Sequence, residues 1–215
     1  ARMGISFAFQ QPVRFKGVQV LDLLRLASGK KLSAAQACQY LSEVGLCAKD
    51  YINREINASL SGGELKRIEI ATVIARNAKL SVFDEPEAGI DLWSFQNLIQ
   101  VFERMRKNNN GSILIISHQE RILNIADVIV VIARDCGALS DAIQKAQSAG
   151  IPVISYDRMV NNANTDLYIS FDNRKVGEIM AQALVNALPQ GGDVFMIQGS
   201  SSDNNVQMVK QGFDD

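Results

Sequence analysis

The chain contains several short, uninterrupted runs of apolar residues, separated by longer segments in which apolar residues recur at helical spacing. The runs lack the polar alternation of a half-exposed strand, so they indicate strands that are buried on both faces. Strands of this kind alternating with helices predict an α/β fold, with a parallel β-sheet flanked by helices. The predicted strands cover residues 79–84, 113–116, 128–132, 151–155, 167–170 and 194–197, and a strand-like stretch opens the chain. The predicted helices cover residues 64–77, 91–107, 119–125, 138–149 and 173–188, and a last helix ends the chain.

Residues 17–60 contain no strand-like run and are predicted to form a small helical subdomain. Ser33 followed by Gln36 fits a capping box, in which each side chain bonds the backbone N–H of the other residue. The helix that starts there is expected to run to about Gly45, because glycine is favoured just after the last helical turn.

Composition narrows the function classes. Of the 215 residues, 47% are hydrophobic and 21% are charged, which is typical of a globular protein of one or two domains. A net charge of −1 gives no electrostatic reason to expect a nucleic-acid or anionic-membrane partner. No apolar run is long enough to span a bilayer and no secretory signal opens the chain, so we expect a soluble protein that is cytoplasmic when expressed. Its native location is left open.

The three cysteines, Cys38, Cys47 and Cys136, are widely spaced and form no CxxC pair. Free thiols in a reducing compartment are the simpler interpretation, and we expect no metal site.

Two stretches have the residue types of a phosphate or metal site. Ser61, Gly62, Gly63 and Glu64 lead into a predicted helix, where unpaired backbone N–H groups and the helix dipole favour an anion. Asp84 and Glu85 come directly after a predicted buried strand, and the C-terminal ends of such strands are where α/β proteins place functional groups. Either stretch alone is weak evidence, because glycine-rich helix starts are common and mostly structural.

Taken together, these and three further motifs resemble those of ABC-type ATPases, most similarly the ATPase subunit of the Suf-type iron–sulfur assembly machinery. Residues 60–64, 83–86, 88–91 and 116–118 read LSGGE, FDEP, AGID and ISH, which match the family's signature loop, Walker B motif, D-loop and H-loop. FQQP at residues 9–12 matches the Q-loop. The resemblance covers about residues 4–132 and implies a P-loop NTPase-like fold, in which the helical subdomain contacts partner subunits.

The resemblance also implies a role for each matched residue. Gln10 would be the Q-loop glutamine, Asp84 would hold Mg²⁺ through water, Glu85 would polarise the attacking water, and His118 would contact the γ-phosphate. The signature loop would act across a dimer, on a nucleotide held by the partner's Walker A loop. A locally hydrogen-bonded strand-end residue is the simpler interpretation of His118.

The family's Walker A loop has no match, because no Gly-Lys-Ser or Gly-Lys-Thr occurs in the 215 residues. Phosphoryl transfer depends almost wholly on positioning the phosphates and Mg²⁺, so we expect the matched residues to be vestigial and the chain not to be an enzyme. ATP and Mg²⁺ remain possible only as residual ligands, and no cofactor is expected. No partner is certain, although a homodimer is possible.

The last third of the chain resembles a different family, the type I periplasmic sugar-binding proteins of the xylose-binding type. The matching stretches read AGIPVISYDRMV and TDLYISFDNRKVGEIMAQAL, and the loop ending SDNN completes them. The resemblance covers about residues 132–215 and implies a flavodoxin- or Rossmann-like half. It also implies that Arg158 and Asn205 bond sugar hydroxyls and that Asp157 precedes the hinge. With one wall of the cleft missing, we expect these residues to be vestigial and Arg158 to be solvated.

Two partial families that meet in a strand-to-helix connection around residues 131–135 suggest an engineered chimera with no evolved catalytic activity, and a natural accident of the same form is the alternative. We expect fragments 1–132 and 133–215 to share one joint core. The strand at 194–197 is expected to fill the position of the missing Walker A strand beside the His118 strand. Two small half-sheets, or strand exchange between two chains, are the alternatives. Residual ATP binding and residual pentose binding remain the competing functions.

Overall fold

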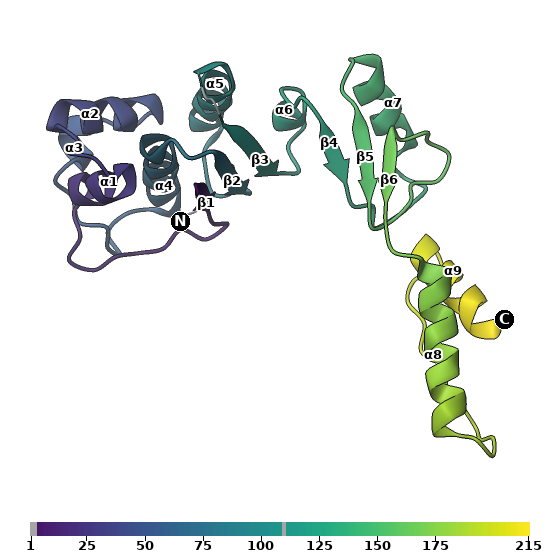
Figure 1. The fold of residues 1–215 in the computed structure, drawn as a ribbon. Coiled ribbons are helices and arrows are strands. Elements are labelled where there is room, and N and C mark those ends of the chain that lie inside the picture. Colours follow the sequence, from purple (N-terminus) through teal and green to yellow (C-terminus); the bar gives the residue numbers. More distant parts are fainter. Residues whose placement is uncertain (1–3, 109–110) are drawn as a thin grey trace. The chain divides into compact units, whose positions relative to one another are not determined.

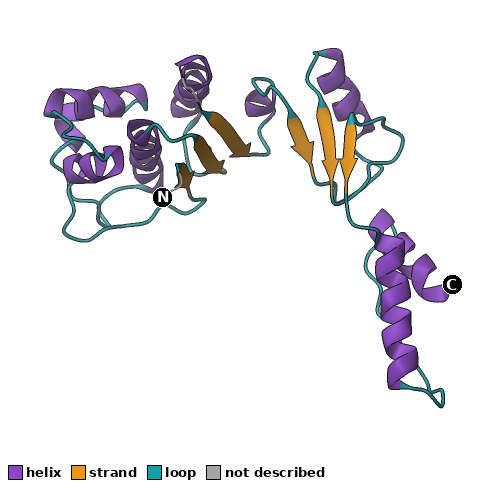
Figure 2. Ribbon diagram, in the orientation of Figure 1, coloured by secondary structure: helices purple, strands orange, loops and turns teal. Residues whose placement is uncertain are grey.

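The computed structural model describes residues 4–108 and 111–215, and it confirms an α/β fold with parallel strands and flanking helices (Figures 1 and 2). The chain divides into two compact units, Ala1–Ile125 and Ala126–Asp215, and each is described by itself. None of the helices in the described residues is long and apolar enough to cross a membrane.

The sheet of the first unit has three parallel strands in the order β1-β2-β3: β1 (Ile5–Ala8), β2 (Leu80–Asp84) and β3 (Ser112–Ile116). The register aligns Ala8 with Phe83, and Asp84 with Ile116. The C-terminal ends of the three strands therefore lie at one edge of the sheet.

Six helices accompany this sheet in the described residues. Residues 17–60 form three short helices, α1 (Val20–Ser28), α2 (Ala34–Glu43) and α3 (Ala48–Tyr51). They are followed by α4 (Gly62–Arg76), α5 (Leu92–Asn108) and α6 (Glu120–Leu123). The capping box at Ser33 and Gln36 is confirmed, because the serine hydroxyl accepts from Gln36 N and the glutamine side chain accepts from Ser33 N.

The core of the first unit joins α4 and α5 to the central strand. Phe83 is fully buried, and its ring meets that of Phe102 edge-on at 5.0 Å between centroids. Ile68 and Ile70 from α4 are also fully buried, although they point in different directions around the helix. A helix with apolar residues on several sides is enclosed by its neighbours, and α4 therefore has little exposed surface to spare for charged residues.

The second unit contains a separate parallel sheet in the order β4-β5-β6: β4 (Ile129–Val131), β5 (Val153–Tyr156) and β6 (Leu167–Ile169). Its helices are α7 (Ser140–Ser148), α8 (Asn173–Ala187) and α9 (Asn204–Asp214). The core is small, with Ala133, Ile143, Val153 and Val160 buried together. The division at residue 132 and the joint core stay predictions.

The prediction for residues 194–197 is wrong. These residues belong to neither sheet, and Phe195 and Ile197 are 94% and 98% exposed. β3 stands at the end of its sheet, with no strand from residues 194–197 beside it. The two three-stranded sheets match the alternative of half-sheets. An apolar run favours a strand only where a neighbouring strand is available to pair with its backbone.

Candidate functional site

The edge formed by the C-terminal ends of β1, β2 and β3 brings together three of the residues singled out in the sequence. Gln10 follows β1 and donates from Nε2 to Glu85 Oε2 at 2.7 Å. His118 follows β3, and its Nε2 lies 3.2 Å from Glu85 Oε1. Glu85 itself follows Asp84, the last residue of β2. One carboxylate thus links the ends of all three strands.

Glu85 adopts an unusual backbone conformation. Its φ of 43° lies in the left-handed region, which non-glycine residues seldom occupy, and its N–H donates to Ile116 O at 2.9 Å. Backbone strain of this kind costs on the order of 1 kcal/mol or more and persists where the surroundings hold it. The hydrogen bonds to β3 and to the Gln10 side chain supply that restraint.

Lys66 of α4 contacts the backbone at this edge of the sheet. It was not identified from the sequence. Its side chain is only 1% exposed, and its ammonium donates to the carbonyl oxygens of Phe9, Asp84 (3.0 Å) and Gln10 (3.4 Å). Burial lowers the pKa of Lys66. Nearby carboxylates raise it and partly offset the effect of burial, and Glu69 makes the largest of these contributions. Lys66 therefore joins the backbone after β1 to the end of β2 and positions Gln10 beside Glu85.

Glu69 lies one turn further along α4 and contacts the same loop. Its Oε1 accepts from Phe9 N at 3.2 Å, whereas its Oε2 is buried without a hydrogen-bond partner. Burial raises the pKa of Glu69, and the hydrogen bond from Phe9 and the charge of Lys66 partly offset it. Lys66 and Glu69 share one face of α4 with the apolar Ile70 and Val73, and charged residues on a face that is otherwise apolar are the signal that sequence inspection could have used.

Replacing Glu69 by glutamine should stabilise the first unit by about 1 kcal/mol at pH 8, because an ionised carboxylate no longer has to be buried. Folding raises the pKa of Glu69 above 4.5, its value in the unfolded chain. The contribution of Glu69 to the free energy of unfolding is therefore fully present below pH 4.5, and it is lost as the pH rises through the pKa of the folded state. The advantage of the variant should therefore grow with pH. Denaturant unfolding at several pH values, followed by fluorescence of Trp93 in α5, measures it.

The control is Glu103→Gln on α5, where the glutamate is exposed and the profile of unfolding free energy against pH should follow that of the parent. An advantage of Glu69→Gln that stays constant from pH 4 to pH 8 would contradict burial of the charge as the cause.

The LSGGE segment forms the start of α4. Ser61 is the N-cap: its hydroxyl accepts from Glu64 N at 3.2 Å, and Glu64 Oε2 accepts from Ser61 N at 2.6 Å. The prediction of unpaired backbone N–H groups is therefore wrong for Ser61 and Glu64, because each accepts from the N–H of the other. The N–H groups of Gly62 and Gly63, in the first turn of the helix, have no acceptor within the helix. A Cβ on Gly63 would lie 2.8 Å from Gly89 O, so this glycine allows the AGID segment to approach α4.

Glu64 has two further partners in the helical subdomain. The Tyr51 hydroxyl donates to Glu64 Oε1, and Arg54 Nη1 lies 3.7 Å from the same oxygen. The hydrogen bond from Tyr51 lowers the pKa of Glu64, and the same bond raises the pKa of Tyr51. The LSGGE segment is thereby tied to α3 and is held by side chains of its own unit.

In the second unit, the residues assigned to sugar binding lie together where β5 ends and α8 and α9 begin. Arg158 Nε lies 3.3 Å from Asp203 Oδ2 and 3.7 Å from Asp157 Oδ2. Asn205 Nδ2 donates to Asp157 O at 3.2 Å, and Asn173 Nδ2 donates to Asn205 Oδ1 at 3.1 Å. Arg158 is therefore ion-paired and two-thirds buried, contrary to the expectation of a solvated arginine.

Asp203 is the residue of this cluster that sequence inspection missed. It caps α9 by accepting from Asn205 N at 3.0 Å, and its second oxygen faces Arg158. Its side chain is 11% exposed, so its ion pair with Arg158 is shielded from water. The N-cap position of Asp203, just before the predicted last helix, was the available signal.

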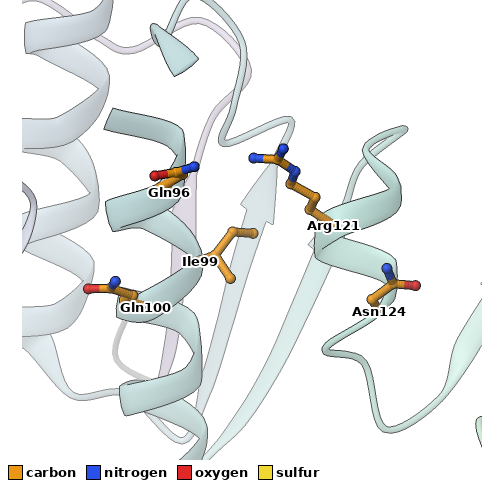
Figure 3. A pocket seen from close by; sticks show the side chains of 5 residues that line it. All are labelled: Gln96, Ile99, Gln100, Arg121 and Asn124. Carbon is orange, nitrogen blue, oxygen red and sulfur yellow. The ribbon is translucent and has the colours of Figure 1, made fainter. Parts of the chain in front are cut away.

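A groove outside both clusters lies between α5 and α6, with a volume of about 390 Å³ (Figure 3). Gln96, Ile99 and Gln100 line it from α5, and Arg121 and Asn124 line it from α6. All but Ile99 are exposed, and none of the residues singled out in the sequence borders it. Across residues 4–108 and 111–215, no group of three His, Cys, Asp or Glu side chains is placed to hold a metal ion.

Comparison with known proteins gives two families along the chain. Residues 1–88 match the ABC transporter family, and residues 97–215 match the periplasmic binding protein domain family. The second match begins before the boundary between the units, although β3 pairs with β2 of the first unit. Strand pairing therefore places residues 97–125 structurally with the ABC-like part.

Individual relatives show the same division. The uncharacterized ABC transporter ATP-binding protein MJ0035 of Methanocaldococcus jannaschii is 36% identical over 61% of this chain and 55% of its own length. The D-xylose-binding periplasmic proteins of Escherichia coli and Haemophilus influenzae are 48% and 43% identical, over 40% and 45% of this chain and 26% and 29% of their own lengths. The chain thus spans about half of the ABC relative and under a third of the xylose-binding ones.

Solved structures support the fold of the first unit. The ATP-binding cassette MJ0796, in a dimeric structure with ADP and Pi, superposes with a TM-score of 0.51 at 19% identity, covering 59% of this chain and 57% of that chain. A second dimeric structure of MJ0796 gives 0.50 at 20% identity, covering 56% and 55%. The match to the periplasmic binding protein domain covers more than half of the 215 residues, so the chain belongs to that family, with an ABC transporter-like segment before it.

Proposed function

We propose that these 215 residues form an engineered chimeric α/β protein without ATP turnover of its own, in which two incomplete ligand sites are preserved as local structure. The observation that carries the proposal is the hydrogen bonding of Glu85. Gln10 Nε2 bonds one carboxylate oxygen at 2.7 Å and His118 Nε2 lies 3.2 Å from the other, so a water molecule bound by Glu85 has to share each oxygen with a side chain of the same unit. The fusion of fragments from an ATP-binding family and an exported sugar-binding family supports an engineered origin.

The residues at this edge do not fit a complete Mg²⁺–ATP site. Phosphoryl transfer needs a glycine-rich turn with a lysine for the β- and γ-phosphates and a hydroxyl ligand for Mg²⁺. Gly-Lys occurs once, at Gly29-Lys30, and it is followed by Lys31 after the end of α1. Lys66 cannot substitute, because its ammonium is buried against three carbonyl oxygens.

The test compares Mg²⁺-dependent phosphate release by the purified chain with that of the Glu85→Gln variant. We expect the two to be indistinguishable from the background without protein. Saturable phosphate release that Glu85→Gln abolishes would overturn the proposal. Calorimetry with Mg²⁺–ATP, with Ser61→Ala as the matched variant, separates nucleotide binding from turnover.

Residual pentose binding is the second candidate, because Arg158, Asn205 and Asp157 converge in one cluster. Guanidinium and amide groups are suited to sugar hydroxyls, yet here Arg158 is ion-paired with Asp203, and Asn205 bonds Asn173 and the backbone of Asp157. Calorimetry with xylose tests this candidate. Binding that Arg158→Ala removes and Arg134→Ala leaves unchanged would support it.

A further inference from the structure

The outer edge of β3 presents unpaired backbone groups. In a parallel ladder, alternate residues of a strand bond the neighbour on one side, and the residues between them face the other side. Ser112 N donates to Lys79 O at 2.8 Å and Ile116 O accepts from Glu85 N at 2.9 Å, so Ser112, Leu114 and Ile116 face β2. The N–H and C=O groups of Ile113 and Ile115 therefore point to the open edge, and none of the described residues forms a strand there.

The segment at residues 194–197 has the complementary property. It is a run of four apolar residues, three of them of the β-branched or aromatic types that favour strands. It is unpaired, and all four side chains are at least 42% exposed. Glycines flank the run, with Gly191 at a φ of 81° before it and Gly199 after it, so the ends can turn without strain.

We propose that residues 194–197 of a second copy of this chain add to the open edge of β3, so that two copies exchange strands. The segment joins α8 to α9 in the second unit, whereas β3 lies in the first, and neither the segment nor the open edge of β3 has a strand partner within its own unit. A two-fold dimer makes the pairing twice, because each copy supplies one edge and one segment. Backbone bonds to Ile113 and Ile115 supply the affinity, as in strand addition to other sheet edges.

The side chains fit this addition as well. In an added strand, Phe195 and Ile197 would lie on one face and Val194 and Met196 on the other. On β3, Leu114 and Ile116 share an exposed face, at 49% and 47%, while Ile113 and Ile115 pack against the core. Apolar residues thus continue the sheet on both faces, which is what an interior parallel strand requires.

Sedimentation equilibrium of the full chain tests the exchange, together with amide hydrogen exchange at two protein concentrations. We expect a reversible dimer, and protection of residues 112–116 and 194–197 that rises with concentration. Met196→Pro should weaken dimerisation at least tenfold, because proline cannot donate to the ladder and disfavours the extended pairing. The residue it replaces is outside every helix and strand, so the fold of the units should survive.

Ser201→Pro is the matched control. It lies in the same loop, in the turn closed by Asp203 N to Ser200 O at 3.1 Å, at the turn position that favours proline. It should leave the dimer intact. A monomer at all concentrations, a dimer insensitive to Met196→Pro, or protection of residues 194–197 that does not depend on concentration would each overturn the proposal.

Discussion

Replacing Lys66 by methionine is expected to lower the free energy of unfolding of the first unit by about 3 kcal/mol. Methionine fills a similar volume but donates no hydrogen bond, so the carbonyl oxygens of Phe9, Gln10 and Asp84 lose their shared donor. Each buried acceptor left without a donor costs about 1–3 kcal/mol. Gln10 is exposed, so water can replace the ammonium at some of these oxygens. The total loss of unfolding free energy is therefore expected to be well below the cost of three buried acceptors without a donor.

Two opposing electrostatic effects contribute to the change in unfolding free energy that Lys66→Met is expected to cause. Burial of the ammonium lowers the pKa of Lys66, so its removal restores some desolvation free energy. Its removal also takes the only buried cation among the described residues away from Glu69, Asp84, Glu87 and Glu85, whose charges raise that pKa. Without Lys66, the carboxylate of Glu69 is partly buried with no opposite charge to offset its burial, which adds to the loss. We therefore expect the net effect to be a loss.

Denaturant unfolding followed by Trp93 fluorescence measures the effect, and Lys79→Met is the control. Lys79 is exposed at the start of β2, and its replacement should change stability by less than about 0.5 kcal/mol. Amide exchange at residues 9–11 gives a second readout, since loss of the Lys66 contacts should free this loop. Equal stability of Lys66→Met and Lys79→Met would show that Lys66 does not hold the strand ends together.

Much of the first unit could be predicted from apolar runs alone. Residues 113–116 are a continuous apolar stretch and lie in β3, and residues 80–83, apolar apart from Ser81, lie in β2, with Phe83 fully buried. Asp84 and Glu85 followed from the same reasoning, whereas Gln10 and His118 were identified through the resemblance to ABC-type ATPases. Parallel strands bring such positions to one edge regardless of which residues fill them.

The failures have a common physical cause, which is that the sequence shows what a residue prefers and not what surrounds it. Residues 194–197 have the composition of a buried strand, yet no neighbour in the structure pairs with them. Lysine and aspartate are usually exposed, yet the ammonium of Lys66 is surrounded by three carbonyl oxygens and Asp203 is ion-paired with Arg158. Partners distant in sequence decide these cases, and a pattern of single residues does not encode them.

The second large effect is expected for Gly212→Ala, which should detach α9 from α8. A Cβ at Gly212 would lie 1.9 Å from Arg174 O, and one at Gly177 would lie 2.0 Å from Val209 O, so the two helices cross with backbone against backbone. A methyl group cannot be accommodated there by rotating a side chain, because the nearest atoms are main-chain atoms. The helices must separate, at an expected cost of about 3 kcal/mol, in the upper part of the range for overpacking.

Amide exchange of α9 is the appropriate measurement, because the change should be local to the second unit. We expect exchange of residues 204–214 to accelerate by about a hundredfold, which corresponds to a loss of roughly 3 kcal/mol, while α4 is unaffected. Gly192→Ala is the control, since a Cβ there would meet Leu188 Cδ1 at an ordinary 3.5 Å and should change little. Separation of the helices would also carry Asp203 and Asn205 away from Arg158 and Asp157, so any xylose affinity should vanish with the same substitution. Unchanged exchange of α9 in Gly212→Ala would show that the close crossing of α8 and α9 does not hold in solution.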